Sequence, residues 1–145
     1  MEGHAAKMHK LGSCWALVVL AITFTAGCGS GQTAPVDGRV KFKDGSDVSV
    51  LSGYEVDFQP AGGKTSASGH LAADGTFKLT TFGADDGAIP GQHRVAITPP
   101  QSADPDKPPQ KSKLPAKYSS FDTSALTAEV KPGRNNIELE LERMP

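Results

Sequence analysis

The sequence predicts an all-β protein, a seven-stranded antiparallel β-sandwich. Glycine contributes 16 and proline 11 of the 145 residues, a share typical of a turn-rich chain rather than a disordered one. Apolar and polar side chains alternate with a period of two in several short segments, and no convincing helical period accompanies them. A chain of 145 residues is long enough for one domain with a single hydrophobic core. The formal net charge of -1 does not fit a nucleic-acid-binding protein.

Residues 1–27 have the organisation of a cleaved signal peptide. Lys7 and Lys10 give a positive n-region, and the uncharged, mostly apolar run 11–24 gives an h-region. This run falls within the about 7–15 residues of a signal h-region and below the roughly 20 that a membrane span needs. We therefore expect export rather than a transmembrane anchor.

The segment ends in Thr25-Ala26-Gly27-Cys28, which resembles a bacterial lipobox. The resemblance implies a diacylglyceryl group on the Cys28 thiol and cleavage between Gly27 and Cys28. Removing 27 of the 145 residues leaves a mature chain of 118, and Cys14 is removed too, so the mature chain can form no internal disulfide. Thr25 stands where the lipobox prefers leucine, which leaves ordinary secretion with cleavage nearby as the alternative.

A flexible tether is predicted over residues 28–35, followed by the domain at 36–142. Alternation predicts a first strand at 36–43 with its even-numbered residues inward, and Asp44-Gly45 predicts a turn after it. A second alternating run covers 48–58, where Gly53 marks a bulge or a break into two strands.

The rest of the domain contains five further predicted strands. Asp74-Gly75 predicts a hairpin between two of them. In a later strand His93 falls on the inward side, and the last strand places a row of glutamates outward. The five cover 66–71, 76–81, 92–98, 126–130 and 136–142.

The segment 99–117 interrupts the ladder of strands. It contains six of the eleven prolines together with four lysines, and proline excludes a central strand. We expect a solvated, partly disordered loop. The functional alternative is a recognition loop that presents an extended ligand or binds an anionic surface.

Seven short segments, taken in order and spacing, resemble a known family over nearly the whole mature chain. They are 36–40, 56–60, 74–79, 87–95, 114–118, 123–127 and 136–139. The family is the carboxypeptidase regulatory-like, or transthyretin-like, domain of small bacterial lipoproteins. The resemblance implies a prealbumin-like Greek-key β-sandwich with no activity of its own, found beside a peptidase or alone on envelope lipoproteins. His93 departs from the family pattern, which has an aromatic residue there.

We predict no catalytic, metal or cofactor site in the mature chain. Gly63-Lys64-Thr65 lacks the earlier glycine of a phosphate-binding loop, since Phe58 stands at that position. The remaining histidines, His70 and His93, are too few for a zinc peptidase cluster. His93 is expected to be a hydrogen-bonded core residue, and His70 with Asp74 a polar turn rather than a metal-ligand pair.

One covalent arrangement is conceivable. Lys41 or Lys43 on the first strand could form an isopeptide bond with Asn135 or Asn136 near the last, with Glu55 as the acid between them. The position of the asparagines at the start of their strand argues against it.

The function expected is a non-enzymatic, membrane-anchored envelope lipoprotein whose sandwich is a binding or structural module. Its partners are the membrane, through the lipid on Cys28, and an envelope protein or polysaccharide, with no nucleic acid. The alternatives are an accessory domain of, or an enzyme acting with, a separately encoded peptidase or hydrolase, and an assembly scaffold without a ligand. Gly29 is not an aspartate, which favours the outer membrane, facing the periplasm or the cell surface.

Overall fold

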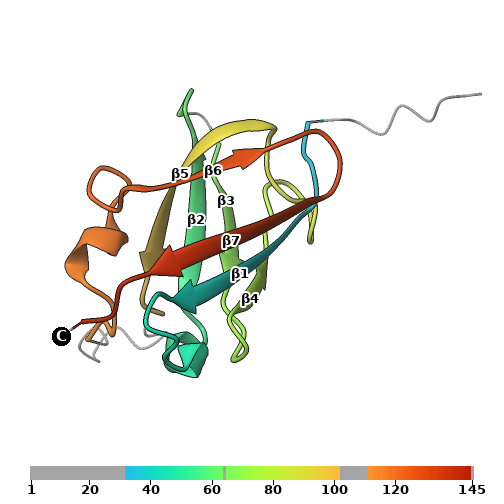
Figure 1. Ribbon diagram of the computed structural model, residues 1–145. Helices are drawn as coiled ribbons and strands as arrows, with labels where there is room; N and C mark the ends of the chain where they lie inside the picture. The colour runs from blue at the N-terminus through green and yellow to red at the C-terminus, as the bar shows by residue number, and fades with distance from the viewer. Residues whose placement is uncertain (1–31, 64, 102–110, 145) are drawn as a thin grey trace, which may run out of the picture.

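The computed structural model describes residues 32–63, 65–101 and 111–144, and the regular secondary structure in them is mostly β, with almost no helix (Figure 1). A three-stranded sheet has the order β4-β1-β7 and a four-stranded sheet the order β3-β2-β5-β6, so the all-β, seven-strand prediction is confirmed. The strands are β1 (Val36–Phe42), β2 (Glu55–Pro60), β3 (Ala67–His70), β4 (Thr76–Lys78), β5 (Gly91–Thr98), β6 (Leu126–Val130) and β7 (Asn135–Leu141), with short 3-10 helices η1 (Val48–Leu51) and η2 (Ala116–Ser119).

The prediction of a wholly antiparallel arrangement is wrong at one pair. β7 lies parallel to β1 over its full length, from Val36 opposite Asn135 to Phe42 opposite Leu141. The cause is the connection between β6 and β7, which passes from the four-stranded to the three-stranded sheet. β7 therefore starts beside the start of β1 and runs with it (Figure 1).

The expected strand at 48–58 begins only at Glu55, because Val48–Leu51 forms η1. Asp47 caps this helix, its carboxylate accepting hydrogen bonds from the backbone N–H and the hydroxyl of Ser49. The helical turn reverses the expected orientation, since Leu51 is buried and Val50 is exposed. Local capping has overridden a period-two pattern here.

The Asp74-Gly75 turn forms, but the predicted hairpin around it does not. The Gly75 N–H donates to the Ala72 carbonyl at 2.9 Å, as in a tight turn. The strands on either side then enter different sheets, β3 pairing with β2 and β4 with β1. Both hydrogen bonds of the Ser68–Thr80 bridge still join the two strand segments, so the turn is a corner between sheets.

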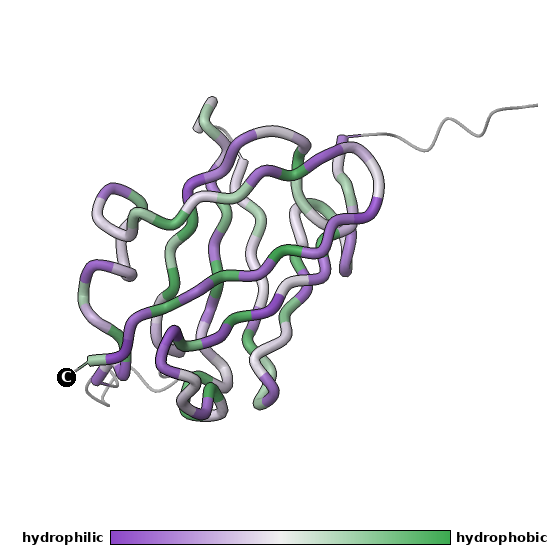
Figure 2. Tube along the Cα trace, in the orientation of Figure 1, coloured by the Kyte–Doolittle hydropathy of each residue, from purple (hydrophilic) through white to green (hydrophobic). Residues whose placement is uncertain are grey.

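One apolar core fills the space between the two sheets. Figure 2 shows the alternation of apolar and polar residues along β1 and β7 that places one side of each strand inward. Phe58 from the four-stranded sheet and Phe77 from β4 meet in this core, with ring centroids 6.1 Å apart. The inward assignment of the even-numbered residues of β1 is thus confirmed for Val36, Val40 and Phe42, all of which are buried.

The end of the predicted solvated loop packs on the core. Leu114 and Tyr118 are buried, and two tyrosine hydroxyls fix the segment. The Tyr54 hydroxyl accepts from the Lys113 N–H at 2.6 Å, and the Tyr118 hydroxyl accepts from the Glu142 N–H at 2.9 Å. The prediction of a solvated loop is therefore wrong for the part that contains Leu114, and residues 102–110 lie outside the described residues.

Candidate functional site

The predicted cleavage and lipid-attachment residues, Gly27 and Cys28, lie outside the described residues. What the structure defines is the point where the chain enters the domain. Ala34 is 2% exposed and forms both backbone hydrogen bonds of a bridge with Ala88, at 2.8 and 3.1 Å. The Pro35 carbonyl accepts from the Asn135 N–H at 2.9 Å. Within the described residues, backbone hydrogen bonds to the rest of the domain thus begin at Ala34, six residues after Cys28 and slightly inside the tether that the sequence predicted.

The loop 81–90 packs against this entry point and is held by one carboxylate. Asp86 accepts from the backbone N–H groups of Thr81, Phe82 and Gly83 at 2.7, 3.0 and 3.0 Å. Desolvation raises the pKa of Asp86, but these three N–H donors outweigh it and leave the pKa below its usual value. Since both carboxylate oxygens are occupied by donors, Asp86 is a structural cap rather than a cation ligand.

Phe82 projects from this loop with 61% of its surface exposed. The loop is close-packed to the entry strand, because a Cβ added at Gly87 would lie 1.8 Å from the Ala34 carbonyl oxygen. We call residues 33–35 together with the loops 81–90 and 131–134 the tether end of the domain; in Figure 1 they lie at the same end. Sequence reasoning did not single out Phe82, although an aromatic residue in a glycine- and aspartate-rich loop was a usable signal.

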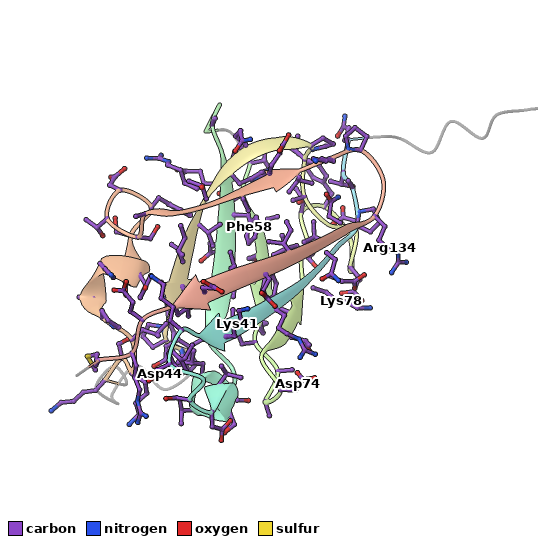
Figure 3. The ribbon with its side chains drawn as sticks, viewed as in Figure 1. Lys41, Asp44, Phe58, Asp74, Lys78 and Arg134 are labelled. Carbon is purple, nitrogen blue, oxygen red and sulfur yellow. The ribbon has the colours of Figure 1, made fainter. Side chains whose placement is uncertain are left out.

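Two adjoining open hollows, of about 440 and 430 Å³, follow the edge where β3 and β4 separate, and both are lined by His70 and Lys78. We call them the β3–β4 groove. Lys78 and Arg134 are labelled in Figure 3. Lys78 lies 3.6 Å from Asp85, and Arg134 pairs with Asp37 at 2.8 Å. The hollow lined by Ser68 and Thr80 is mostly polar, whereas the one lined by Ala72 and Phe77 exposes more apolar than polar surface. The groove therefore fits a ligand that has hydrogen-bonding groups and an apolar face.

His70 and Asp74 do not act together in this groove. The Asp74 carboxylate accepts from the N–H and hydroxyl of Thr76, at 3.0 and 2.6 Å, and these bonds lower its pKa. His70 is instead in register with Glu55 of β2. Among residues 32–63, 65–101 and 111–144, no three His, Cys, Asp or Glu side chains gather as a metal site would require.

Asp57 is a half-buried acid on the outer face of the four-stranded sheet, between Ser68 and Ala96 on the neighbouring strands. Burial, followed by the charge of Glu55, raises its pKa to about 6, with His70 acting in the opposite direction. Such shifted acids are frequent at catalytic sites. Neither hollow of the β3–β4 groove is lined by Asp57, however, so its titration bears on stability.

His93 is 2% exposed in the core, beside the ring of Phe58 at a centroid distance of 5.9 Å. Its Nε2 lies 2.7 Å from the Ile89 carbonyl oxygen, a distance at which Nε2 carries the proton and donates. The prediction of a hydrogen-bonded core histidine is confirmed at this nitrogen. Nδ1 is buried and has no hydrogen-bond partner among the residues that the structure describes.

The geometry is against the isopeptide bond. Lys41 pairs with Glu138 and Glu140, at 2.6 and 3.2 Å. Asn136 is in register with Asp37, four residues before Lys41 along β1, and the Asn135 side chain is held by backbone groups of the turn before β7. Glu55, the proposed acid, is on the other sheet.

A third hollow, of about 270 Å³, lies at the opposite end of the domain. Phe42, Val50 and Met144 provide apolar surface there, and Lys113 and Arg143 provide positive charge. We call η1 together with residues 111–114 and 142–144 the far end. Its combination of apolar and cationic groups fits an acidic segment with an apolar side chain.

Comparison with known proteins gives no further guide. No family model, curated protein or solved structure matches the chain. Within the described part of the chain, none of the helical segments has the length and apolar character that a membrane span requires.

Proposed function

We propose that the protein is a lipid-anchored envelope lipoprotein whose β-domain is a non-enzymatic binding or structural module. The observation that carries the proposal is the run Thr25-Ala26-Gly27-Cys28, placed after a charged and then apolar N-terminal segment and six residues before buried Ala34. A domain that starts this soon after a lipidated cysteine would be held beside the membrane. Each buried methylene of an acyl chain contributes about 0.8 kcal/mol, so two or three chains give lasting attachment.

The fold proposed for the module is the transthyretin-like Greek-key sandwich. Seven strands in sheets of three and four around one core support it, as does the order of the seven sequence segments that resemble the family. The parallel β1–β7 pair is the feature any comparison with that family must reproduce.

The far-end hollow and the β3–β4 groove are the surfaces on which binding would take place. The far end combines apolar groups with Lys113 and Arg143, which favours a segment of an acidic envelope protein. The groove offers hydroxyl, imidazole and cationic groups, which favours a polysaccharide.

Crosslinking in intact cells, followed by purification through the domain, would identify the partner. Loss of crosslinks in a Lys113→Glu variant but not in a Lys78→Glu variant would assign the partner to the far end.

Membrane fractionation tests the anchor. The full chain is expected in the membrane fraction and resistant to high salt and carbonate, and extracted by detergent. Cys28→Ser is expected to release the folded protein or leave it as an uncleaved precursor. A Cys14→Ser variant is the matched control and should fractionate like the unchanged protein, because Cys14 lies in the segment removed. Equal membrane association of the Cys14→Ser protein and of a Cys28→Ser chain that has lost residues 1–27 would contradict the proposal, as would turnover of peptides by the purified mature domain.

A further inference from the structure

We infer that the tether end of the domain lies on the membrane surface, with Phe82 inserted at the boundary between lipid headgroups and acyl chains. This inference rests on the lipid attachment at Cys28 proposed above. It adds an orientation for the domain and a second point of contact with the bilayer.

The reach of the chain restricts which end can meet the membrane. Six Cα steps separate Cys28 from Ala34, and each spans at most about 3.6 Å, so the two residues are at most about 22 Å apart. Ala34 is fixed by its bridge to Ala88, which belongs to the Phe82 loop. A lipid at Cys28 therefore holds this loop near the bilayer at high effective concentration.

Phe82 has the chemistry of an interfacial anchor. Aromatic rings are favoured at the level of lipid headgroups, and most of this ring is exposed to solvent. Lys131 is exposed on the neighbouring turn, where it can meet anionic headgroups, and Arg134 on the same turn is exposed but paired with Asp37 at 2.8 Å. The negative charges of the two acids in the loop are offset by nearby donors and a cation. Asp86 accepts hydrogen bonds from three backbone N–H groups, and Asp85 lies 3.6 Å from Lys78.

The loop presents the ring in a fixed position before it meets lipid. Besides the Asp86 cap, the Thr81 hydroxyl donates to the Gly87 carbonyl at 2.6 Å, and the Asp85 N–H donates to the Thr80 hydroxyl at 3.2 Å. A preorganised loop loses little conformational entropy when its side chain inserts. The insertion then requires no refolding of the loop.

The other large exposed apolar side chains of the described residues, Val50 and Met144, are at the far end. β1 runs between the two ends over seven residues, about 23 Å at the usual rise per strand residue. The short tether would have to pass along the domain for these residues to reach lipid. They are therefore matched controls for Phe82, similar in exposure and opposite in position.

The test uses tryptophan fluorescence, because Trp15 is the one tryptophan of the sequence and leaves with the signal peptide. A Phe82→Trp variant is expressed from the full-length sequence, and its lipidated mature chain is purified. This chain is reconstituted in vesicles of phosphatidylethanolamine and phosphatidylglycerol, with and without brominated acyl chains. We expect blue-shifted emission and at least twofold quenching by the brominated lipid. The Val50→Trp variant in the same vesicles is expected to emit as in water and to be quenched little.

Two results would overturn the inference, and they are distinguishable. If the mass of the same sample shows lipid on Cys28 but the Phe82→Trp variant is quenched no more than the Val50→Trp variant, the orientation is wrong and the lipoprotein assignment stands. If the sample carries no lipid on Cys28, the proposed function fails and the orientation fails with it.

Discussion

Gly38 has no side chain because the ring of Phe77 occupies the space where one would lie. The two residues are cross-strand neighbours in the β1–β4 pair, and a Cβ at Gly38 would lie 2.0 Å from the ring Cζ. An alanine there forces the ring or the strand to move within a filled core, and overpacking of this kind costs about 1–3 kcal/mol.

Gly38→Ala is therefore expected to lower the free energy of unfolding by about 1–3 kcal/mol, measured by urea denaturation. The matched control is Gly62→Ala, since nothing lies within 4 Å of a Cβ there and the backbone φ is not positive. The control should stay within about 0.5 kcal/mol of the unchanged protein. Equal midpoints for the two variants would contradict the packing described.

Asp57 gives the domain a pH dependence of unusual sign for an acid. Its pKa is raised to about 6 in the folded state from 3.8, so the folded state binds more protons than the unfolded state between these values. Stability should consequently fall as the pH rises from about 4 to 6 and then level off. Allowing for the partial exposure of the group, the loss is about 1 kcal/mol.

Asp57→Asn is expected to abolish this decrease and to raise stability by about 1 kcal/mol at pH 8, measured by urea denaturation at several pH values. Glu142→Gln is the comparison. Lys117 and Lys43 lower the pKa of Glu142 to about 2, so its contribution is present above pH 4.5 and lost as the pH falls through 2. An unchanged slope between pH 4 and 6 in Asp57→Asn would show that another group titrates there.

Among the elements, the segment around η2 closes one side of the core. Leu114 is 1% exposed, and the hydroxyls of Tyr54 and Tyr118 bind backbone N–H groups of the segment and of the chain after β7. Thus a proline-rich stretch without a strand still supplies core side chains. The pairing of Lys117 and Glu142 adds an exposed contact between the same two parts.

We expect Leu114→Ala to lower the free energy of unfolding by about 2–5 kcal/mol, as removal of a fully buried leucine side chain does. Lys111→Ala, an exposed substitution three residues earlier, should have an effect within about 0.5 kcal/mol. Thermal unfolding followed by circular dichroism measures both. A Leu114→Ala variant with the midpoint of the control would mean that the segment does not pack in solution as described.

The long alternating runs allowed good prediction of their elements. The observed bounds agree within one residue with the ranges expected from the sequence for β1, β5, β6 and β7. An alternation of apolar and polar residues over five or more positions is typical of a half-buried strand and of no other regular element. η1 was missed because the Asp47 cap is a local hydrogen bond that alternation does not report. The change of sheet between β3 and β4 and the parallel direction of β7 depend on long-range pairing, which no local pattern encodes.

The candidate sites were less predictable for the same reason. The run 25–28 that resembles a lipobox is contiguous in sequence, so it could be proposed as an anchor from the residues alone. The β3–β4 groove, the far-end hollow and the Phe82 loop each combine residues from distant parts of the chain, which only the fold brings together.

For the whole molecule, the proposed function gives separate roles to the packed domain and to the N-terminal segment. The core and all seven strands come from residues after Thr33, so a chain of residues 32–145 is expected to fold without the segment before it. Its circular dichroism spectrum and unfolding midpoint should match those of the Cys28→Ser protein. A chain of residues 37–145, which lacks Ala34 and Val36, should be less stable because it loses the Ala88 bridge and a core side chain. Equal stability of the two truncated chains would contradict this boundary.

In the orientation that we propose, the tether end of the domain faces the bilayer and the far end faces away from it. The hollow lined by Val50, Lys113 and Arg143 would then face the envelope space, where a partner can reach it. The β3–β4 groove would lie along the side of the domain.

The central claim is that Cys28 carries lipid and is the first residue of the mature protein. Intact mass spectrometry of the protein purified from membranes, with fragmentation of its N-terminal peptide, tests this most directly. The account predicts a chain beginning at Cys28 with the added mass of a diacylglyceryl group, with or without a further acyl chain. An unmodified Cys28, or a chain that still begins at Met1, would contradict it.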